Sequence, residues 1–317
     1  MNQFLKYSIR IIAIIMLVFV ITAISYYQKD IPVDTLIKKY GSTDSRFMPL
    51  MGMNVHYRDE GNQLDSTPIL LIHGTASSLF TWDSSVLILK ENHRVIRFDL
   101  PAFALTGPNP EKDYSMEYYN HFVDSFLIKL NIHQCILVGN SLGGTIAWRY
   151  SLLHPEKVAK LVLVDAGGML PAVPTKGSTG FKIAQMPVFS SIVKYITPKI
   201  LVIKSLRETY GDPSKVKDWQ GSLYFDMLLR EGNREALVDR LKFNFLLDET
   251  AKIMQIKTPT LIVWGDKDQL IPVENAYRFN KVIANSELEV MKGIGHIPME
   301  ESPTEFANRV RMFIDKK

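Results

Sequence analysis

The sequence predicts an α/β protein built around a mostly parallel sheet that helices cover on both faces. Short, largely apolar runs recur along the chain, and stretches of helical character separate them. Such runs are typical of strands buried on both faces, and their alternation with helices is typical of a parallel sheet. The runs lie at residues 69–72, 95–98, 135–138, 161–164, 260–263 and 287–291.

An early hairpin and a late helical insertion complete this prediction. Residues 47–58 alternate around Gly52, which is consistent with an antiparallel hairpin that opens the sheet. After Asp165 the buried runs stop, and helical patterns with apolar faces follow up to residue 253. We therefore predict an α/β core at residues 46–166 and 254–317, with a helical cap at 167–253 inserted into it.

Composition narrows the class of protein. The 317 residues are 46% hydrophobic and 22% charged, which is ordinary for a globular chain with one large domain. A net charge of +4 without dense Lys/Arg clusters argues against a nucleic-acid partner. Cys135 is the single cysteine, so no intrachain disulfide is possible. Because it opens a predicted buried strand, we expect a structural role for it and not a catalytic one.

The N-terminus differs sharply from the rest of the chain. Residues 11–23 are almost entirely apolar, Lys6 and Arg10 precede them, and polar residues follow from Ser25. We expect residues 1–25 to be an uncleaved signal anchor, with a cleaved signal peptide as the alternative. Residues 26–45 would form a polar tether. The first reading predicts a membrane-anchored protein with its catalytic domain outside the cytoplasm, and the second predicts a secreted or periplasmic one.

The segment Gly139-Asn140-Ser141-Leu142-Gly143 is the most informative motif. It follows the apolar run 135–138 and precedes a stretch that favours helix. A Gly-x-Ser-x-Gly between strand and helix forms a sharp turn that exposes the serine hydroxyl as a nucleophile. The two glycines are needed because the backbone there passes close to its neighbours.

A serine nucleophile needs a histidine base, and that histidine needs an acid to orient it. His296 lies in a glycine-flanked loop after the last predicted strand, and Asp268 lies just beyond the strand before it. Loops at the carboxyl ends of parallel strands share one edge of the sheet, so the three side chains can converge. Asp266 and Asp165 are the alternatives for the acid.

The reaction also needs backbone N–H groups that stabilise the oxyanion. One should come from Leu142, the residue after the nucleophile, at the start of its helix. The second should come from the loop after residue 72, where we nominate Thr75, with Ala76 as the alternative.

These motifs together resemble the α/β-hydrolase fold family over about residues 47–315. The matching segments, in order, are His73-Gly74 followed by Trp82, Asp99-Leu100-Pro101, Thr106-Gly107-Pro108, Gly139 to Gly144, His154-Pro155, Gly265 to Asp268 and Gly295 to Pro298. The resemblance implies a mostly parallel eight-stranded sheet with an inserted helical cap. Within the family, the chain looks most like bacterial serine lipases and esterases and membrane-anchored monoacylglycerol lipases. One departure is that Ala102 and Ala104 stand where the family usually has glycine.

The resemblance implies hydrolysis of carboxylic esters through an acyl-enzyme on Ser141. The substrate would be a small-molecule or lipid ester with a medium or long acyl chain, and no metal or organic cofactor is implied. The alternative is a carbon–carbon bond hydrolase or lactonase with the same three side chains. A third possibility is a membrane-tethered binding protein without catalytic activity.

Overall fold

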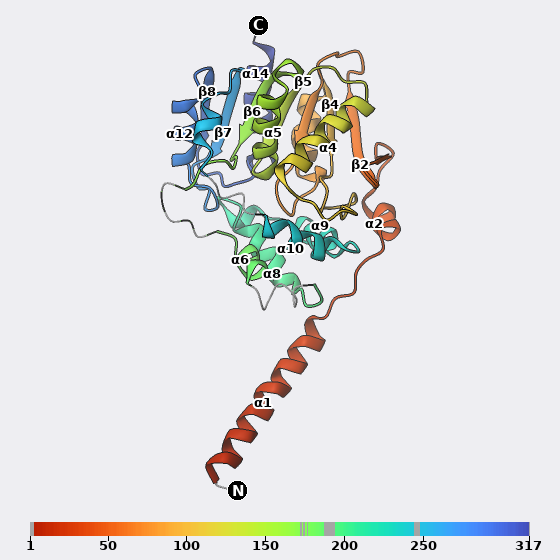
Figure 1. Cartoon of the computed structure of the whole chain (residues 1–317), viewed down its shortest axis with the longest axis vertical. Helices are drawn as coiled ribbons and strands as arrows, with labels where there is room; N and C mark the ends of the chain where they lie inside the picture. Colours follow the sequence, from red (N-terminus) through yellow and green to blue (C-terminus); the bar gives the residue numbers. More distant parts are fainter. Residues whose placement is uncertain are drawn as a thin grey trace.

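An eight-stranded sheet forms the centre of the computed structural model (Figure 1). The structure describes residues 3–171, 173, 175, 177–186, 194–243 and 248–316. The strand order is β1-β2-β4-β3-β5-β6-β7-β8. β1 and β2 form the antiparallel hairpin expected at 47–58, β2 is antiparallel to β4, and all the other neighbours are parallel. The strands are β1 (Arg46–Leu50), β2 (Met53–Gly61), β3 (Ile69–Ile72), β4 (Arg94–Phe98), β5 (Cys135–Asn140), β6 (Val158–Val164), β7 (Thr260–Gly265) and β8 (Ser286–Met291).

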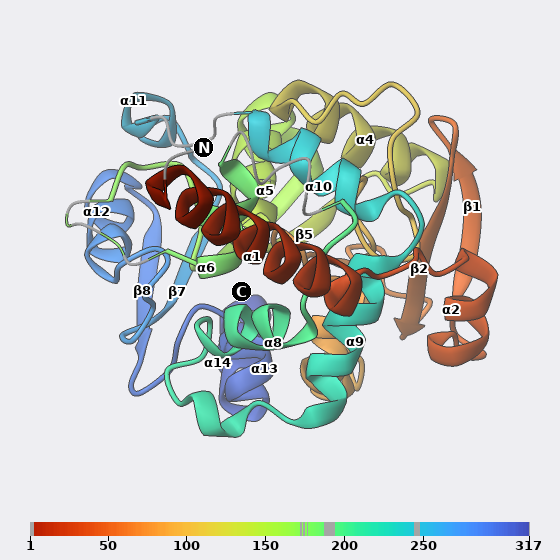
Figure 2. The ribbon, with the colours of Figure 1, turned by 90° about the horizontal axis from the view of Figure 1, so that it is seen from below.

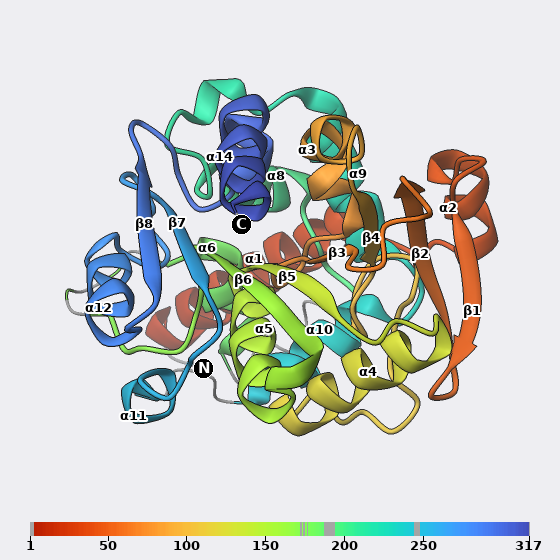
Figure 3. The same ribbon diagram turned by 90° about the horizontal axis from the view of Figure 1, so that it is seen from above.

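The side chains of the central strands point alternately to the two faces of the sheet and form a hydrophobic core on each face. In β3, Leu70 and Ile72 join one core, while Ile69 and Leu71 join the other. This follows from the strand geometry, because successive side chains point to opposite faces. Figure 3 shows α3 and α14 on one side of the sheet and α4 and α5 on the other. The covering helices are α3 (Asp83–Leu89), α4 (Met116–Lys129), α5 (Leu142–Leu153), α12 (Glu274–Val282), α13 (Pro298–Glu301) and α14 (Pro303–Asp315).

Cys135 lies fully buried in the first of these cores, as its place in the strand predicted. Burial raises the pKa of its thiol to about 12. A thiol with that pKa is protonated at neutral pH and is therefore a poor nucleophile.

Helices occupy the described part of the chain between β6 and β7. They are α6 (Thr179–Gln185), α8 (Lys199–Arg207), α9 (Asp218–Leu229), α10 (Asn233–Lys242) and α11 (Thr250–Ile253). The described residues also form the short 3₁₀ helices η1 (Leu79–Trp82), η2 (Pro155–Lys157) and η3 (Pro213–Lys215). Figure 1 places α6, α8, α9 and α10 together at one end of the sheet, and Figure 2 shows them on the side of the molecule where α1 lies. Residues 187–193 and 244–247 of the predicted cap lie outside the described residues.

The N-terminal prediction of a membrane anchor is wrong. Residues at the start of the chain do form a helix, α1 (Gln3–Tyr26), which extends away from the other helices in Figure 1. However, within the part of the chain that the structure describes, no helix has the length and apolar character needed to cross a membrane. The apolar run 11–23 is shorter than the roughly 20 residues that a span requires. The membrane-anchored localisation that we derived from this run is overturned with it.

The stretch that we expected as a polar tether is held against the helices between β6 and β7. Ile31 donates its N–H to the carbonyl of Leu229 (2.8 Å) and accepts the N–H of Glu231 (3.0 Å). Asp30 accepts a hydrogen bond from Arg234 Nη2 at 2.6 Å. Helix α2 (Val33–Tyr40) then docks through its last residue, because the Tyr40 hydroxyl donates to Asp226 at 2.7 Å.

The loop with alanine in place of glycine has a strained backbone. Ala102 has φ +86° and Ala104 has φ +47°. Both side chains are buried, and the Ala102 N–H donates to the Gly107 carbonyl at 2.8 Å. A residue with a Cβ pays about 1–2 kcal/mol in the left-handed region. The strain is held in place by Asp99, whose buried carboxylate accepts the N–H groups of Leu79 and Leu105.

We therefore expect Ala102→Gly to be neutral or to stabilise the protein by up to about 1 kcal/mol, because relief of strain offsets the lost methyl burial. Ala147 in α5 is a matched control, since it is equally buried but lies in helical backbone. Ala147→Gly should cost about 2 kcal/mol. Urea unfolding of both variants measures the difference between their free energies of unfolding. Equal losses of stability in the two variants would contradict the strain at Ala102.

Candidate active site

Ser141 lies at a sharp turn between β5 and α5, as the motif predicted. Its φ of +54° is in the region that L-residues seldom adopt, and its N–H donates to the Val164 carbonyl at 3.0 Å. Neither flanking glycine could carry a side chain, because backbone atoms of neighbouring segments lie too close. A Cβ on Gly139 would lie 2.2 Å from the Gly143 carbonyl oxygen, and one on Gly143 would lie 2.1 Å from that of Ile72.

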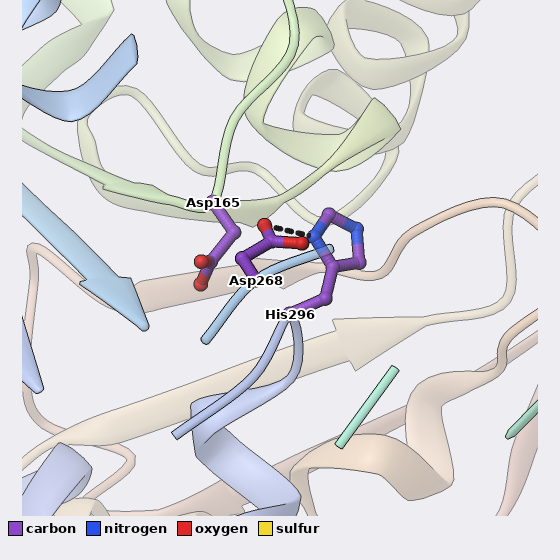
Figure 4. Close-up of side chains that lie close together, drawn as sticks. All are labelled: Asp165, Asp268 and His296. Carbon is purple, nitrogen blue, oxygen red and sulfur yellow. Dashed lines mark hydrogen bonds and ion pairs between the residues drawn. The ribbon is translucent and has the colours of Figure 1, made fainter. Parts of the chain in front are cut away.

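His296 and Asp268 are brought together in a buried pair (Figure 4). Nδ1 of His296 lies 2.7 Å from Oδ2 of Asp268. Oδ1 of Asp268 accepts the N–H groups of Leu270 (2.8 Å) and Ile271 (3.1 Å). Because a carboxylate can only accept, Nδ1 carries the hydrogen and Nε2 is left as an acceptor. This is the tautomer that a general base needs.

The alternative acids differ in position. Asp266 faces another loop, where Oδ1 accepts the N–H of Gly293 at 2.7 Å. Asp165 is fully buried beside the His296–Asp268 pair, as Figure 4 shows. Burial and the neighbouring Asp268 carboxylate raise the pKa of Asp165 well above its usual range.

Asp165, Asp268 and His296 also form the one group among the described residues whose geometry could hold a metal ion, since their ligand atoms lie within 4.8 Å of one another. The 2.7 Å hydrogen bond between His296 and Asp268 already engages one nitrogen and one oxygen that an ion would take. The surroundings are buried, and one carboxyl is driven toward its neutral form. The donor set therefore fits a hydrogen-bonded cluster better than a cation site.

Two cavities meet at Ser141 and His296, and Thr75 also lines both of them. Leu142 lines the second cavity. The nominated nucleophile, base and oxyanion loops therefore surround one space, while Asp268 lies behind the histidine. Ala76, the alternative to Thr75, lines the first cavity only and has φ +56°.

The loop that carries His296 is braced by residues that the sequence analysis did not identify. The N–H of His296 donates to the Thr209 carbonyl at 2.7 Å. The Glu301 carboxylate accepts the N–H groups of Gly211 (2.8 Å), Asp212 (2.9 Å) and Gly295 (2.8 Å). This brace joins the His296 loop to the chain between α8 and α9.

Glu300, the residue before Glu301, also connects this loop to distant parts of the chain. Its partly buried carboxylate accepts hydrogen bonds from Thr81 (2.6 Å), Tyr210 (2.9 Å), Gln220 (3.0 Å) and Tyr224 (2.5 Å). The pair Glu300-Glu301, shortly after His296, was the sequence signal that could have pointed to these contacts. Their partners could not be inferred from it, because they lie far away in the sequence.

Two polar residues near the site have structural partners. Asn140 Nδ2 donates to the carbonyls of Val164 (3.2 Å) and His296 (3.0 Å), so it ties the serine turn to the histidine loop. His73 is fully buried, its Nδ1 bonds the Gly74 carbonyl, and its Nε2 accepts the N–H of Leu100. Burial lowers the pKa of His73. Both ring nitrogens of His73 are therefore engaged by backbone groups, which gives this residue a structural role.

The sheet, its helices and this cluster define the class of protein. A model described as the alpha/beta hydrolase family matches residues 69–309. The chain therefore belongs to the alpha/beta hydrolase family, and the resemblance seen in the sequence is confirmed.

Its relatives include proteins with different named substrates. The chain is 27% identical over 280 residues to a 2-hydroxy-6-oxo-6-(2'-aminophenyl)hexa-2,4-dienoic acid hydrolase of Metapseudomonas resinovorans, across 86% of this chain and 91% of that one. It is 28% identical over 274 residues to Lipase 1 of Psychrobacter immobilis, across 83% of this chain and 81% of the lipase. A solved structure of a serine-to-alanine mutant of a meta-cleavage product hydrolase from Pseudomonas fluorescens superposes with a TM-score of 0.74 at 24% identity, covering 85% of this chain and 97% of that one. At this level of sequence identity, the similarity to the solved structure is evidence for the fold alone.

Proposed function

We propose that the protein is a serine hydrolase that cleaves carboxylic esters with medium or long acyl groups. The observation that carries this proposal is the first cavity, which begins at Ser141 and His296 and continues among apolar side chains. No Lys, Arg, Asp or Glu is among the described residues that line it. Its apolar lining includes Phe181, Ile183, Ile196, Leu201, Val202, Leu206, Leu228 and Leu237.

In this proposal, Ser141 attacks the ester carbonyl while Nε2 of His296 takes the hydroxyl proton. The hydrogen bond to Asp268 keeps the imidazole in the correct tautomer and stabilises its charged form. The amides of Leu142 and Thr75 stabilise the oxyanion, aided by the N-terminus of α5. His296 then protonates the leaving alcohol, and water attacks the acyl-enzyme with His296 again acting as base. The helices between β6 and β7 act as a cap that supplies most of the acyl-binding side chains.

A second candidate function has its own supporting observation. The second cavity shares Ser141 and His296 but adds Lys182, Arg240 and Lys242. Cationic side chains recognise a substrate carboxylate. This lining favours hydrolysis of a carbon–carbon bond in a diketone acid, and the similarity to the dienoic acid hydrolase supports the same alternative.

Substrate profiling separates the two candidates. The whole chain is assayed with p-nitrophenyl esters from acetate to palmitate and, in parallel, with a 2-hydroxy-6-oxo-dienoic acid. The ester proposal expects a kcat/KM that rises with acyl length and little turnover of the dienoic acid. The reverse order would reject it in favour of the carbon–carbon hydrolase. Lys182→Met should then raise KM for the acid alone, while Lys204→Met, on α8 and outside both cavities, serves as its control.

A further inference from the structure

The cluster in Figure 4 contains two buried carboxyl groups beside one imidazole, although the proposed mechanism uses only one of them. The side chain of Asp268 is 0% exposed, that of His296 is 5% exposed, and Asp165 as a residue is 0% exposed. One oxygen of each carboxyl and one imidazole nitrogen lie within 4.8 Å of one another. Two carboxylates this close in a buried site do not both ionise, so one of them holds a proton.

The hydrogen bonds identify which carboxyl is charged. Asp268 accepts from three N–H groups, those of Leu270, Ile271 and His296. Asp165 accepts from one, the N–H of Gly265 at 3.0 Å on Oδ1. Its Oδ2 is buried and accepts no hydrogen bond from an N–H or O–H group of the described residues, which leaves it free to carry a hydrogen. Because N–H donors stabilise a carboxylate, the charge belongs on Asp268 and the proton on Asp165.

The charges around Asp165 act in the same direction. Burial is the largest cause that raises its pKa, the Asp268 carboxylate is the second, and Glu301 adds a smaller contribution. The Gly265 N–H opposes them. His296 is the remaining titratable group of the cluster, and its ring is turned toward Asp268.

The backbone holds Asp165 at this place. β6 and β7 are neighbouring parallel strands, with Val164 paired to Val263, so their carboxyl ends bring Asp165 and Asp268 to one edge of the sheet. The N–H of Asp165 donates to the Val263 carbonyl at 3.1 Å. Its φ is +45°, a conformation that Asp and Asn tolerate better than other residues with a Cβ.

We propose that Asp165 is a positioning residue that donates its carboxyl hydrogen to Asp268, and that it becomes the orienting carboxylate for His296 when Asp268 is removed. This inference rests on the proposed function only for the role of His296 as the base. Asp165 acts on the reaction through Asp268 and His296 and does not contact the reacting atoms.

A double-mutant cycle tests the proposal. The proteins are the whole chain, Asp165→Asn, Asp268→Ala and the double variant, and the readout is the rate at which a fluorophosphonate labels Ser141. In that reaction the serine oxygen bonds to phosphorus, fluoride leaves, and His296 accepts the hydroxyl proton. An Asn amide still donates to Asp268 and still accepts from Gly265, but it cannot ionise.

The expected rates are strongly non-additive. Asp165→Asn alone should slow labelling by less than about threefold, since the hydrogen bond to Asp268 persists. Asp268→Ala should slow it about 10²-fold, and the double variant about 10⁴-fold, which is the loss seen when a triad with a single acid is deprived of it. Equal rates for Asp268→Ala and the double variant would overturn the proposal, because Asp165 would then give no support to His296.

A measurement that needs no substrate tests the protonation of Asp165 independently of the proposed function. Infrared difference spectra between the unchanged protein and Asp165→Asn at pH 7 should contain the carbonyl band of a protonated carboxylic acid. Absence of that band would overturn the inference even if Asp268→Ala failed to fold. If the unchanged protein neither reacts with the fluorophosphonate nor hydrolyses any ester, the proposed function fails, whereas the infrared band still decides the state of Asp165.

Discussion

Replacing Ser141 with alanine should reduce ester hydrolysis by about 10⁴- to 10⁶-fold, the range found when a serine nucleophile is removed. No other described hydroxyl stands at a comparable turn, where the backbone is strained and the side chain lines both cavities with His296. Alanine has the same Cβ as serine, so the turn and the glycine contacts around it are retained. The loss should therefore appear in kcat, while the midpoint of thermal unfolding changes little.

Ser178→Ala is the matched control for this experiment. Ser178 also lines both cavities, and its Oγ is buried without a hydrogen-bond partner among the described residues. Removing that oxygen should alter kcat/KM by no more than a few-fold. If Ser141→Ala retained full activity, or if Ser178→Ala were equally damaging, Ser141 would not be the nucleophile.

The features that could be predicted from the sequence are those that local patterns determine. The apolar runs predicted the strands because a strand buried on both faces has few other compositions available. The serine turn could be recognised because its requirements, a nucleophile between two small residues, lie within five positions. The roles assigned to Ser141, His296 and Asp268 stay predictions, although the structure brings these residues to one place.

The features that could not be predicted depend on contacts between distant parts of the chain. Nothing in the local sequence of residues 26–45 indicates that Asp30 meets Arg234 or that Tyr40 meets Asp226. The membrane segment was inferred from the hydropathy of a short run, and within the described part of the chain no helix combines the length and the apolar character that a span needs. Asp165 was named only as an alternative acid, since its closeness to Asp268 follows from the pairing of β6 with β7.

Gly143→Ala should be strongly destabilising although it adds only one methyl group. An added Cβ would lie 2.1 Å from the Ile72 oxygen, 2.6 Å from its carbonyl carbon and 2.7 Å from the His73 oxygen. All three are backbone atoms of the β3 end and the loop after it, so no side chain can rotate away. The start of α5 would have to move away from β3, at a cost of about 3 kcal/mol or more. Ser141 would move with it, and a misplacement of about 1 Å can reduce the rate 10²-fold.

Gly293→Ala provides the comparison that isolates this contact. Gly293 has φ +75°, and a Cβ placed there would have no atom within 4 Å. Its cost should be the backbone strain alone, about 1–2 kcal/mol. Urea unfolding should therefore separate the two variants by more than about 1 kcal/mol, with activity lost in Gly143→Ala at temperatures where it remains folded. If both variants lost the same stability and kept the same activity, the close approach of α5 to β3 would not be what holds Ser141 in place.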